Sequence, residues 1–137
     1  MSLLLDTNVV SELRKGKRAD GNLRSWFAGL PEHDIHLSVL VLGELRRGIE
    51  AIRGRDATQA VALERWLKEL SAAHADRILP VDAPVAEQWG RLTATRPASV
   101  IDTLMAATAL VHGLVLVTRN VKDVRWTGVS CLNPFTA

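Results

Sequence analysis

The sequence lacks the residues that would cross-link a small secreted protein or anchor a chain in a membrane. It has one cysteine, Cys131, in 137 residues, so it cannot form an internal disulfide. Its apolar runs fall short of the roughly 18 residues that a membrane-spanning helix needs. The first residues also lack the basic segment, apolar stretch and cleavage site of a secretory signal. We therefore expect one soluble, cytoplasmic domain over residues 1–137, which is long enough to bury its own core.

Several catalytic signatures are missing as well. The chain contains no Walker phosphate loop, no Gly-x-Ser-x-Gly nucleophile turn and no glycine-rich dinucleotide fingerprint. The 17 basic and 15 acidic residues give a net charge of +2, which permits a nucleic-acid or anionic protein partner without requiring one. The four histidines are scattered and have no zinc-ligand spacing; they are His33, His36, His74 and His112.

The sequence does contain a regular alternation of short apolar segments with amphipathic segments, whose apolar residues recur every three or four positions. This alternation predicts an α/β domain with a central, mainly parallel sheet. Pro80 favours an edge position for its strand, and Gly113 is the residue type that ends a helix. The expected strands cover residues 2–6, 35–37, 77–81, 114–117 and 130–132. The expected helices cover residues 9–14, 22–30, 39–54, 56–73, 85–95 and 99–112, the third and fourth forming an antiparallel hairpin.

Four acidic residues lie at or near the ends of the predicted strands. Asp6 ends the first strand, and Glu44 follows the second within two helical turns. Asp102 opens the helix that precedes the fourth strand, and Asp123 follows that strand by six residues. In open α/β sheets, ligands bind beyond the carboxyl ends of the strands. We therefore expect these four side chains to face one cleft.

Each of these acids also has an ordinary structural explanation when it is taken alone. Asp6 belongs to an Asp-Thr-Asn trio that is typical of helix N-caps, with Thr7 and Asn8 as the expected caps. Asp102 fits a capping box that begins at Ser99, and Asp123 lies in a polar turn over residues 118–123. Glu44 interrupts a mostly apolar run, and it either pairs with Arg46 or Arg47 or lies at the solvent edge of its helix.

The four acids together indicate a metal site. Four carboxylates in one cleft repel one another and raise their pKa values unless cations are present. Oxygen-only ligands favour Mg²⁺ or Mn²⁺ over zinc. A magnesium ion that keeps several waters can supply a nucleophile and bind a phosphate oxygen, which is the chemistry of phosphodiester hydrolysis.

Four segments that contain these acids resemble a known family. The sequence resembles the PIN-domain ribonucleases, and within them the VapC-type toxins of type II toxin–antitoxin pairs, in the FitB-like subgroup. The match covers nearly the whole chain, with the motifs in order. The segments are LLDTNVVSE at 4–12, LGELRRG at 42–48, IDTLMAATA at 101–109 and LVTRNVKD at 116–123, followed by LNPF at 132–135.

The resemblance implies a PIN-like α/β/α sandwich and an endoribonuclease that depends on Mg²⁺ or Mn²⁺. It also implies a homodimer, a VapB-like antitoxin partner, an RNA substrate, and contact with operator DNA only through the antitoxin. In this family the metal-binding acids would be Asp6, Glu44, Asp102 and Asp123. We expect Asp6 and Asp102 to hold the principal ion, Glu44 to help bind it or orient water, and Asp123 to complete the site. The products would be a 5′-phosphate and a 3′-hydroxyl.

Two further groups of residues are candidates around these acids. Side chains that orient the carboxylates or water are expected at Thr7, Asn8, Thr118 and Asn120, although each could equally be a cap or turn residue. Contacts with RNA phosphates or with an acidic antitoxin segment are expected at Arg14, Lys15, Arg46 and Arg119.

Two departures from the family pattern and two competing functions bear on this hypothesis. The segment between Trp89 and Asp102 is shorter than is usual, and Val124 stands where an aromatic residue often follows the fourth acid. A phospho-receiver domain is disfavoured because Pro80 interrupts the strand that should carry the accepting Asp. A PIN fold that binds a partner without catalysis is disfavoured by the presence of all four acids.

Overall fold

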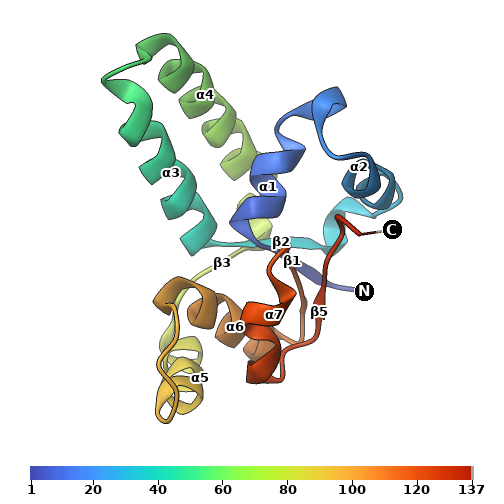
Figure 1. Cartoon of the computed structure of the whole chain (residues 1–137), viewed down its shortest axis with the longest axis vertical. Helices are drawn as coiled ribbons and strands as arrows, with labels where there is room; N and C mark the ends of the chain where they lie inside the picture. The colour runs from blue at the N-terminus through green and yellow to red at the C-terminus, as the bar shows by residue number, and fades with distance from the viewer. Residues whose placement is uncertain (137) are drawn as a thin grey trace.

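The computed structural model describes residues 1–136, which form a five-stranded parallel sheet in the order β3-β2-β1-β4-β5 (Figure 1). β1 pairs in parallel with β2 and β4, which in turn pair with β3 and β5. The expected mainly parallel sheet is confirmed. The strands are β1 (Leu3–Leu5), β2 (Ile35–Ser38), β3 (Ile78–Leu79), β4 (Val115–Val117) and β5 (Cys131–Leu132).

Helices cover both faces of the sheet, which confirms the expected α/β/α sandwich. In Figure 1, α1 to α4 lie on one side of the strands and α5 to α7 on the other. The helices are α1 (Thr7–Leu13), α2 (Gly21–Ala28), α3 (Val39–Arg53), α4 (Ala57–Ala73), α5 (Ala83–Thr93), α6 (Val100–His112) and α7 (Val121–Val124). Short 3-10 turns are η1 (Gly16–Arg18), η2 (Glu32–Asp34), η3 (Ala75–Arg77) and η4 (Arg125–Thr127). No helix within residues 1–136 is both long and apolar enough to cross a membrane.

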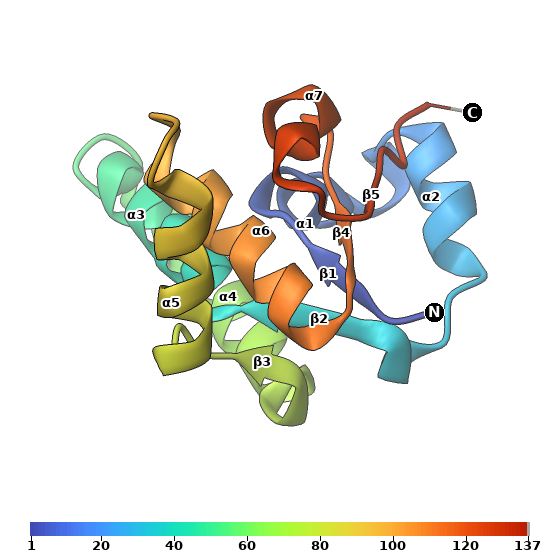
Figure 2. The same ribbon diagram turned by 90° about the horizontal axis from the view of Figure 1, so that it is seen from below.

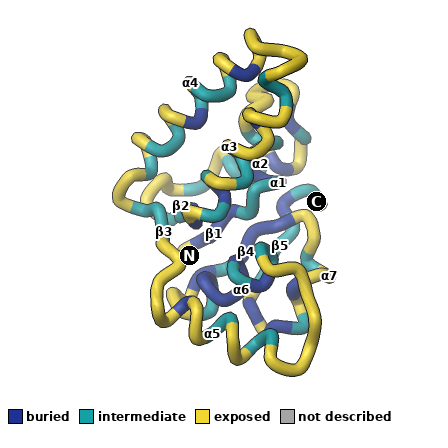
Figure 3. The backbone as a smooth tube through the Cα atoms, turned by 90° about the vertical axis from the view of Figure 1, so that its left-hand side faces the viewer, coloured by how far each residue is buried: buried dark blue, intermediate teal, exposed yellow. Residues whose placement is uncertain are grey.

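The core is centred on β1, whose three leucines are at most 3% exposed. A strand buried on both faces needs apolar residues at every position, which explains the unbroken Leu3–Leu5 run. Val115–Val117 and the small-residue face of α6 complete the same core, and the dark segments of Figure 3 gather there. Val124 is 4% exposed within this core, so it anchors α7 although it is not aromatic.

Several predicted boundaries were wrong by a few residues, and the capping contacts explain the main ones. Asp6 itself, rather than Thr7 or Asn8, caps α1, because its carboxylate accepts the Thr7 N–H at 2.7 Å. The segment predicted as a polar turn at 118–123 contains the start of α7, and the third strand contracts to Ile78–Leu79 at the sheet edge. Ser38 and Ser99 cap α3 and α6 as expected.

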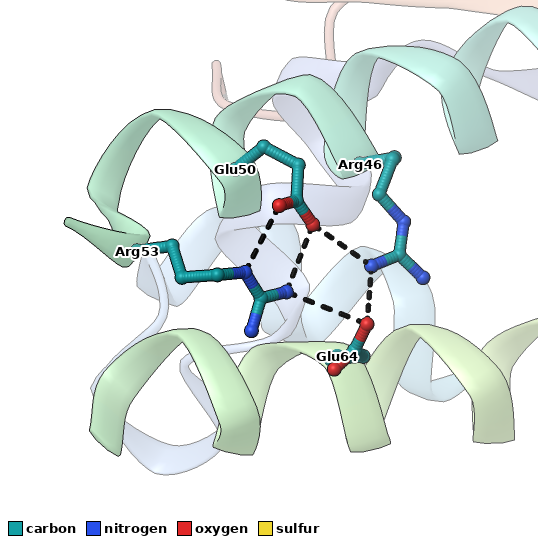
Figure 4. A network of polar contacts seen from close by, with 4 residues as sticks. All are labelled: Arg46, Glu50, Arg53 and Glu64. Carbon is teal, nitrogen blue, oxygen red and sulfur yellow. Dashed lines mark hydrogen bonds and ion pairs between the residues drawn. The ribbon is translucent and has the colours of Figure 1, made fainter. Parts of the chain in front are cut away.

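The α3–α4 hairpin projects from the body and is mostly exposed along its length (Figure 3). A small apolar cluster of Ile49, Ala60 and Leu67 joins its two helices. At the surface, Arg46 and Arg53 of α3 bind Glu64 of α4 at 2.6 and 3.4 Å, and both also bind Glu50 (Figure 4). The predicted antiparallel pairing of these two helices is therefore confirmed.

The ion-pair network predicts a specific pH dependence of stability. The Arg53 guanidinium, with Arg46, lowers the pKa of Glu50 from 4.5 to about 2. A lowered folded-state pKa gives stability that is present above 4.5 and is lost as the pH falls toward 2. Thermal melts of Glu50→Gln should therefore show a small loss of Tm at neutral pH that shrinks with acidification and with added salt. A Tm difference that stays constant across this pH range would contradict this assignment.

Two glycines should respond to alanine in opposite directions. Gly113 ends α6 in the left-handed region, with φ of +66°, so Gly113→Ala should lower the free energy of unfolding by about 1–2 kcal/mol. Gly90 lies inside α5 with open space around its Cα, so Gly90→Ala should raise it by about 0.5–1 kcal/mol. Urea titration of both variants measures the two shifts; the same sign in both would contradict these backbone roles.

Candidate carboxylate site

The candidate site lies at the carboxyl edge of the sheet, where β1, β2 and β4 end. Asp6 directly follows β1, and its N–H donates to the carbonyl oxygen of Val117 at the end of β4. Glu44 lies in the second turn of α3, which begins directly after β2. Asp102 is in the first turn of α6, and Asp123 belongs to α7. The topology therefore places each of the four predicted acids near one edge of the sheet.

Asp6 is held by a network of side chains from two strand ends. Thr118, which is 1% exposed, donates its hydroxyl to Asp6 Oδ2 at 2.8 Å. Asn8 Nδ2 donates to the same oxygen at 3.2 Å and to Thr118 Oγ1 at 3.3 Å. Asn8 Oδ1 accepts the backbone N–H of Arg119 at 3.1 Å, which ties α1 to the turn after β4. These contacts fix the orientation of the Asp6 carboxylate.

Glu44 is oriented by a residue of α1. Thr7 Oγ1 donates to Glu44 Oε1 at 2.5 Å, while the Arg47 guanidinium lies 3.9 Å from Oε2. The alternative pairing with Arg46 was wrong, because Arg46 points to Glu64 on α4. The Glu44 side chain is 24% exposed, so it is half-buried and still open to solvent. Both Thr7 and Glu44 line a groove of about 250 Å³ between α1 and α3.

The electrostatics of Asp102 connect it with the other three acids. Burial raises the pKa of Asp102, and the negative charges of Asp6, Asp123 and Glu44 raise it further. Its backbone N–H reaches the Ser99 hydroxyl at 3.5 Å, so the expected cap is also present. The position of Asp102 is therefore compatible with both the capping explanation and the cluster explanation. Mutual repulsion among the carboxylates makes the cluster a place where a cation is favoured.

The donor chemistry of this cluster suits a hard divalent cation. All of its candidate ligands are carboxylate oxygens, the type that magnesium prefers. Within residues 1–136, no group of three or more histidine, cysteine or acidic side chains is arranged so that it could hold a metal ion. Magnesium is commonly held by one or two protein carboxylates and several waters, which is fewer protein ligands than such a group supplies. The residues fit the ion in chemistry and in charge.

The predicted orienting residues divide into two kinds. Thr7, Asn8 and Thr118 contact the carboxylates directly through their side chains. Asn120 is linked to the site through its backbone N–H, which donates to Thr118 Oγ1 at 3.1 Å. Directly or through Thr118, these hydroxyl and amide groups fix the orientation of the Asp6 and Glu44 carboxylates.

The predicted basic residues differ in the groups that they contact. Arg14 lines the groove that contains Thr7 and Glu44. Lys15 binds Glu12 at 3.0 Å, and Arg46 is engaged in the α3–α4 network of Figure 4. The Arg119 guanidinium lies 3.8 Å from the centre of the Phe135 ring. Of the four, Arg14 is the one that shares a groove with one of the acids, Glu44.

A known protein family matches most of this chain. The PIN domain family model matches residues 3–123, a span that contains all four acids. This chain belongs to the PIN-domain family. The match begins with β1 and ends on Asp123, so it covers the strands and helices that form the site.

Two relatives place this PIN domain near the VapC and FitB toxins. It is 32% identical to VapC ribonuclease Y4jK of Sinorhizobium fredii, covering 97% of each chain. It is 31% identical to toxin FitB of Neisseria gonorrhoeae, covering 97% of this chain and 98% of FitB. A chain in the structure of FitAB bound to an IR36 DNA fragment superposes with a TM-score of 0.88 at 27% identity, covering 98% of this chain and 96% of that one.

Removal of one charge from the cluster should stabilise the metal-free PIN domain. The ionised form of Asp102 is disfavoured by burial and by three other carboxylates, so Asp102→Asn should raise the Tm measured in a chelator. The same variant should gain less Tm than the wild type on addition of Mg²⁺. Glu69→Gln, which removes an exposed carboxylate of α4, serves as the control and should change neither value. A lower Tm for Asp102→Asn in chelator would contradict the repulsive cluster.

Proposed function

We propose that this PIN domain is a metal-dependent endoribonuclease and the toxin of a type II toxin–antitoxin system. The observation that carries the proposal is the position of four acids near one edge of the sheet, where burial and the charges of Asp6, Asp123 and Glu44 disfavour the ionised form of Asp102. Negative charges held near one another lower the stability of the fold, and a divalent cation bound for catalysis would offset this loss. The names of the two relatives, VapC ribonuclease and toxin FitB, support the same activity.

The chain's own residues have distinct roles in this proposal. Asp6 and Asp102 would hold the principal Mg²⁺ or Mn²⁺ ion, and the contacts of Thr118 and Asn8 keep Asp6 in place for it. A bound divalent ion supplies a water nucleophile near neutral pH and offsets negative charge on a phosphate. Water that attacks phosphorus in line would release the 3′-oxygen and leave a 5′-phosphate on the other fragment.

The remaining two acids act at the sides of the cluster. Glu44, oriented by the Thr7 hydroxyl, would orient the attacking water or add one oxygen to the ion's surroundings. Asp123 is exposed on α7, where it would complete the site or support a second ion. Asn120 would assist indirectly by fixing the Thr118 hydroxyl through its backbone N–H.

The proposal includes partners outside the chain. The substrate is RNA, and the inhibitor is a VapB-like antitoxin that contacts operator DNA; the structural relative FitAB is itself described as bound to a DNA fragment. Contacts with RNA phosphates or with the antitoxin are assigned to Arg14, Lys15, Arg46 and Arg119. Arg14 is the strongest of these because it lines the groove next to Glu44. The active protein is proposed to be a homodimer in the cytoplasm.

Metal-dependent RNA cleavage tests this function. The purified wild type, incubated with a panel of transfer, ribosomal and messenger RNAs, should cleave at least one of them in Mg²⁺ or Mn²⁺ and none in EDTA. Asp6→Asn and Asp102→Asn should abolish cleavage, and Asn at position 6 can still cap α1. Thr118→Val removes the hydroxyl that orients Asp6 while keeping the side chain's volume, so it should lower the rate about 10- to 100-fold.

The controls separate loss of chemistry from loss of folding. Glu69→Gln should cleave like the wild type, and thermal melts should show that all variants are folded. If the wild type cleaves no RNA above the level of Asp6→Asn in either metal, the ribonuclease proposal is wrong. The chain would then be a PIN fold that acts by binding alone.

A further inference from the structure

A stacked pair of side chains lies beside the carboxylate site. The Arg96 guanidinium carbon is 4.6 Å from the centre of the Trp126 ring. Arg96 is exposed in the connection between α5 and α6, and Trp126 is half-buried in η4. The indole Nε1–H donates to the backbone carbonyl of Asp123 at 3.1 Å, which fixes the ring on the turn that carries this acid.

The pair connects the two segments that supply Asp102 and Asp123. Arg96 precedes Ser99, the N-cap of the helix that contains Asp102, by three residues, and Trp126 follows Asp123 by three. In Figure 2 the α5–α6 connection and α7 stand at the same end of the molecule, and α6 packs against α7. An aromatic ring is thereby presented at the border of the carboxylate group.

Trp126 differs from the other three tryptophans in what surrounds it. Trp26 and Trp66 pack against the main apolar core, and Trp89 donates its Nε1–H to Thr103 on α6 at 2.9 Å. The polar contacts of Trp126 are instead with the backbone carbonyl of Asp123 and with the exposed guanidinium of Arg96. Its ring is therefore covered by a side chain that can move away without disturbing the core.

A nucleobase can take the place of the Arg96 guanidinium over the Trp126 ring. An exposed cation–π contact is weak, whereas stacking of a base on an aromatic side chain contributes more and tolerates any base. A base inserted between the two groups would need about 7 Å, two ordinary contact distances, so Arg96 must swing out. The released guanidinium would then be free to bind a phosphate of the same strand.

We propose that Trp126 is a base-stacking subsite for single-stranded RNA and that Arg96 covers it until substrate binds. The inference rests on the proposed ribonuclease function and assigns two substrate-binding residues to it. The bases of a duplex are already stacked on each other, so an indole beside the site favours an unpaired nucleotide next to the phosphate that is cut. Trp126 is thus a substrate-binding residue that takes no part in bond breaking.

Equilibrium binding of a short fluorescein-labelled single-stranded RNA, measured in EDTA to prevent cleavage, tests the subsite. Trp126→Phe keeps an aromatic face and should bind within about twofold of the wild type. Trp126→Leu keeps the apolar bulk but cannot stack, and should raise the Kd roughly tenfold or more. RNA should also quench tryptophan emission in the wild type, and most of that quenching should disappear in Trp126→Phe.

Arg96→Gln and the control Arg55→Gln, an exposed arginine in the α3–α4 turn, complete the set. Arg96→Gln should leave the quenching intact and weaken the salt dependence of binding, and Arg55→Gln should change neither. If Trp126→Leu binds RNA like the wild type, or if quenching persists in Trp126→Phe, the subsite is wrong. If Trp126→Leu also loses the Mg²⁺-induced rise in Tm, the pair is a structural clasp and the inference is overturned.

These results are distinguishable from failure of the ribonuclease proposal. A wild type that cleaves RNA in Mg²⁺ while Trp126→Leu retains full affinity refutes the stacking subsite alone. A wild type that neither binds nor cleaves any RNA refutes the proposed function and the subsite together.

Discussion

The repulsion among four carboxylates at one edge of the sheet is the constraint on which the rest of the structure depends. Asp6, Glu44, Asp102 and Asp123 come from four different parts of the fold, and burial together with the charges of the other three raises the pKa of Asp102. Like charges separate if their attachments allow it. Here the attachments do not allow it for Asp6, because the most buried strand of the molecule ends directly at that residue. The fold therefore supplies the free energy that keeps the acids together.

Neutral polar residues around the cluster hold two of its carboxylates in place. Thr118 is 1% exposed and directs its hydroxyl at Asp6, and Thr7 does the same for Glu44. Hydrogen bonds to a carboxylate stabilise its charged form without adding a competing cation. The α3–α4 network shows the opposite solution, in which Glu50 and Glu64 are balanced by arginines. The protein thus pairs the acids of the α3–α4 hairpin with arginines, and orients Asp6 and Glu44 at the sheet edge with threonine hydroxyls.

Much of this could be predicted from the sequence, and the exceptions have physical causes. The parallel sheet, its helices and the four acids follow from apolar periodicity and from the rule that polar residues gather at strand ends. The N-cap of α1 was misassigned because Asp, Thr and Asn are all good caps, and only the position of the strand end chooses among them. α7 has four residues, too short for a periodic pattern to appear. The Arg96–Trp126 pair joins residues thirty positions apart, which no local pattern connects.

The strand order β3-β2-β1-β4-β5 has a consequence for how the site can change over time. The chain places β2 and β3 on one side of β1 and then returns to place β4 and β5 on the other side. The connections that follow β1 and β4 therefore lie on opposite faces of the sheet. A crevice opens at such a topological switch point whatever residues line it. The placement of Asp6 and Thr118 together at this edge is therefore a product of connectivity and needs no dedicated loop. Substitutions in the connecting segments, such as those that hold Arg96 and Trp126, can therefore alter the surroundings of the site without moving the strand end that carries Asp6.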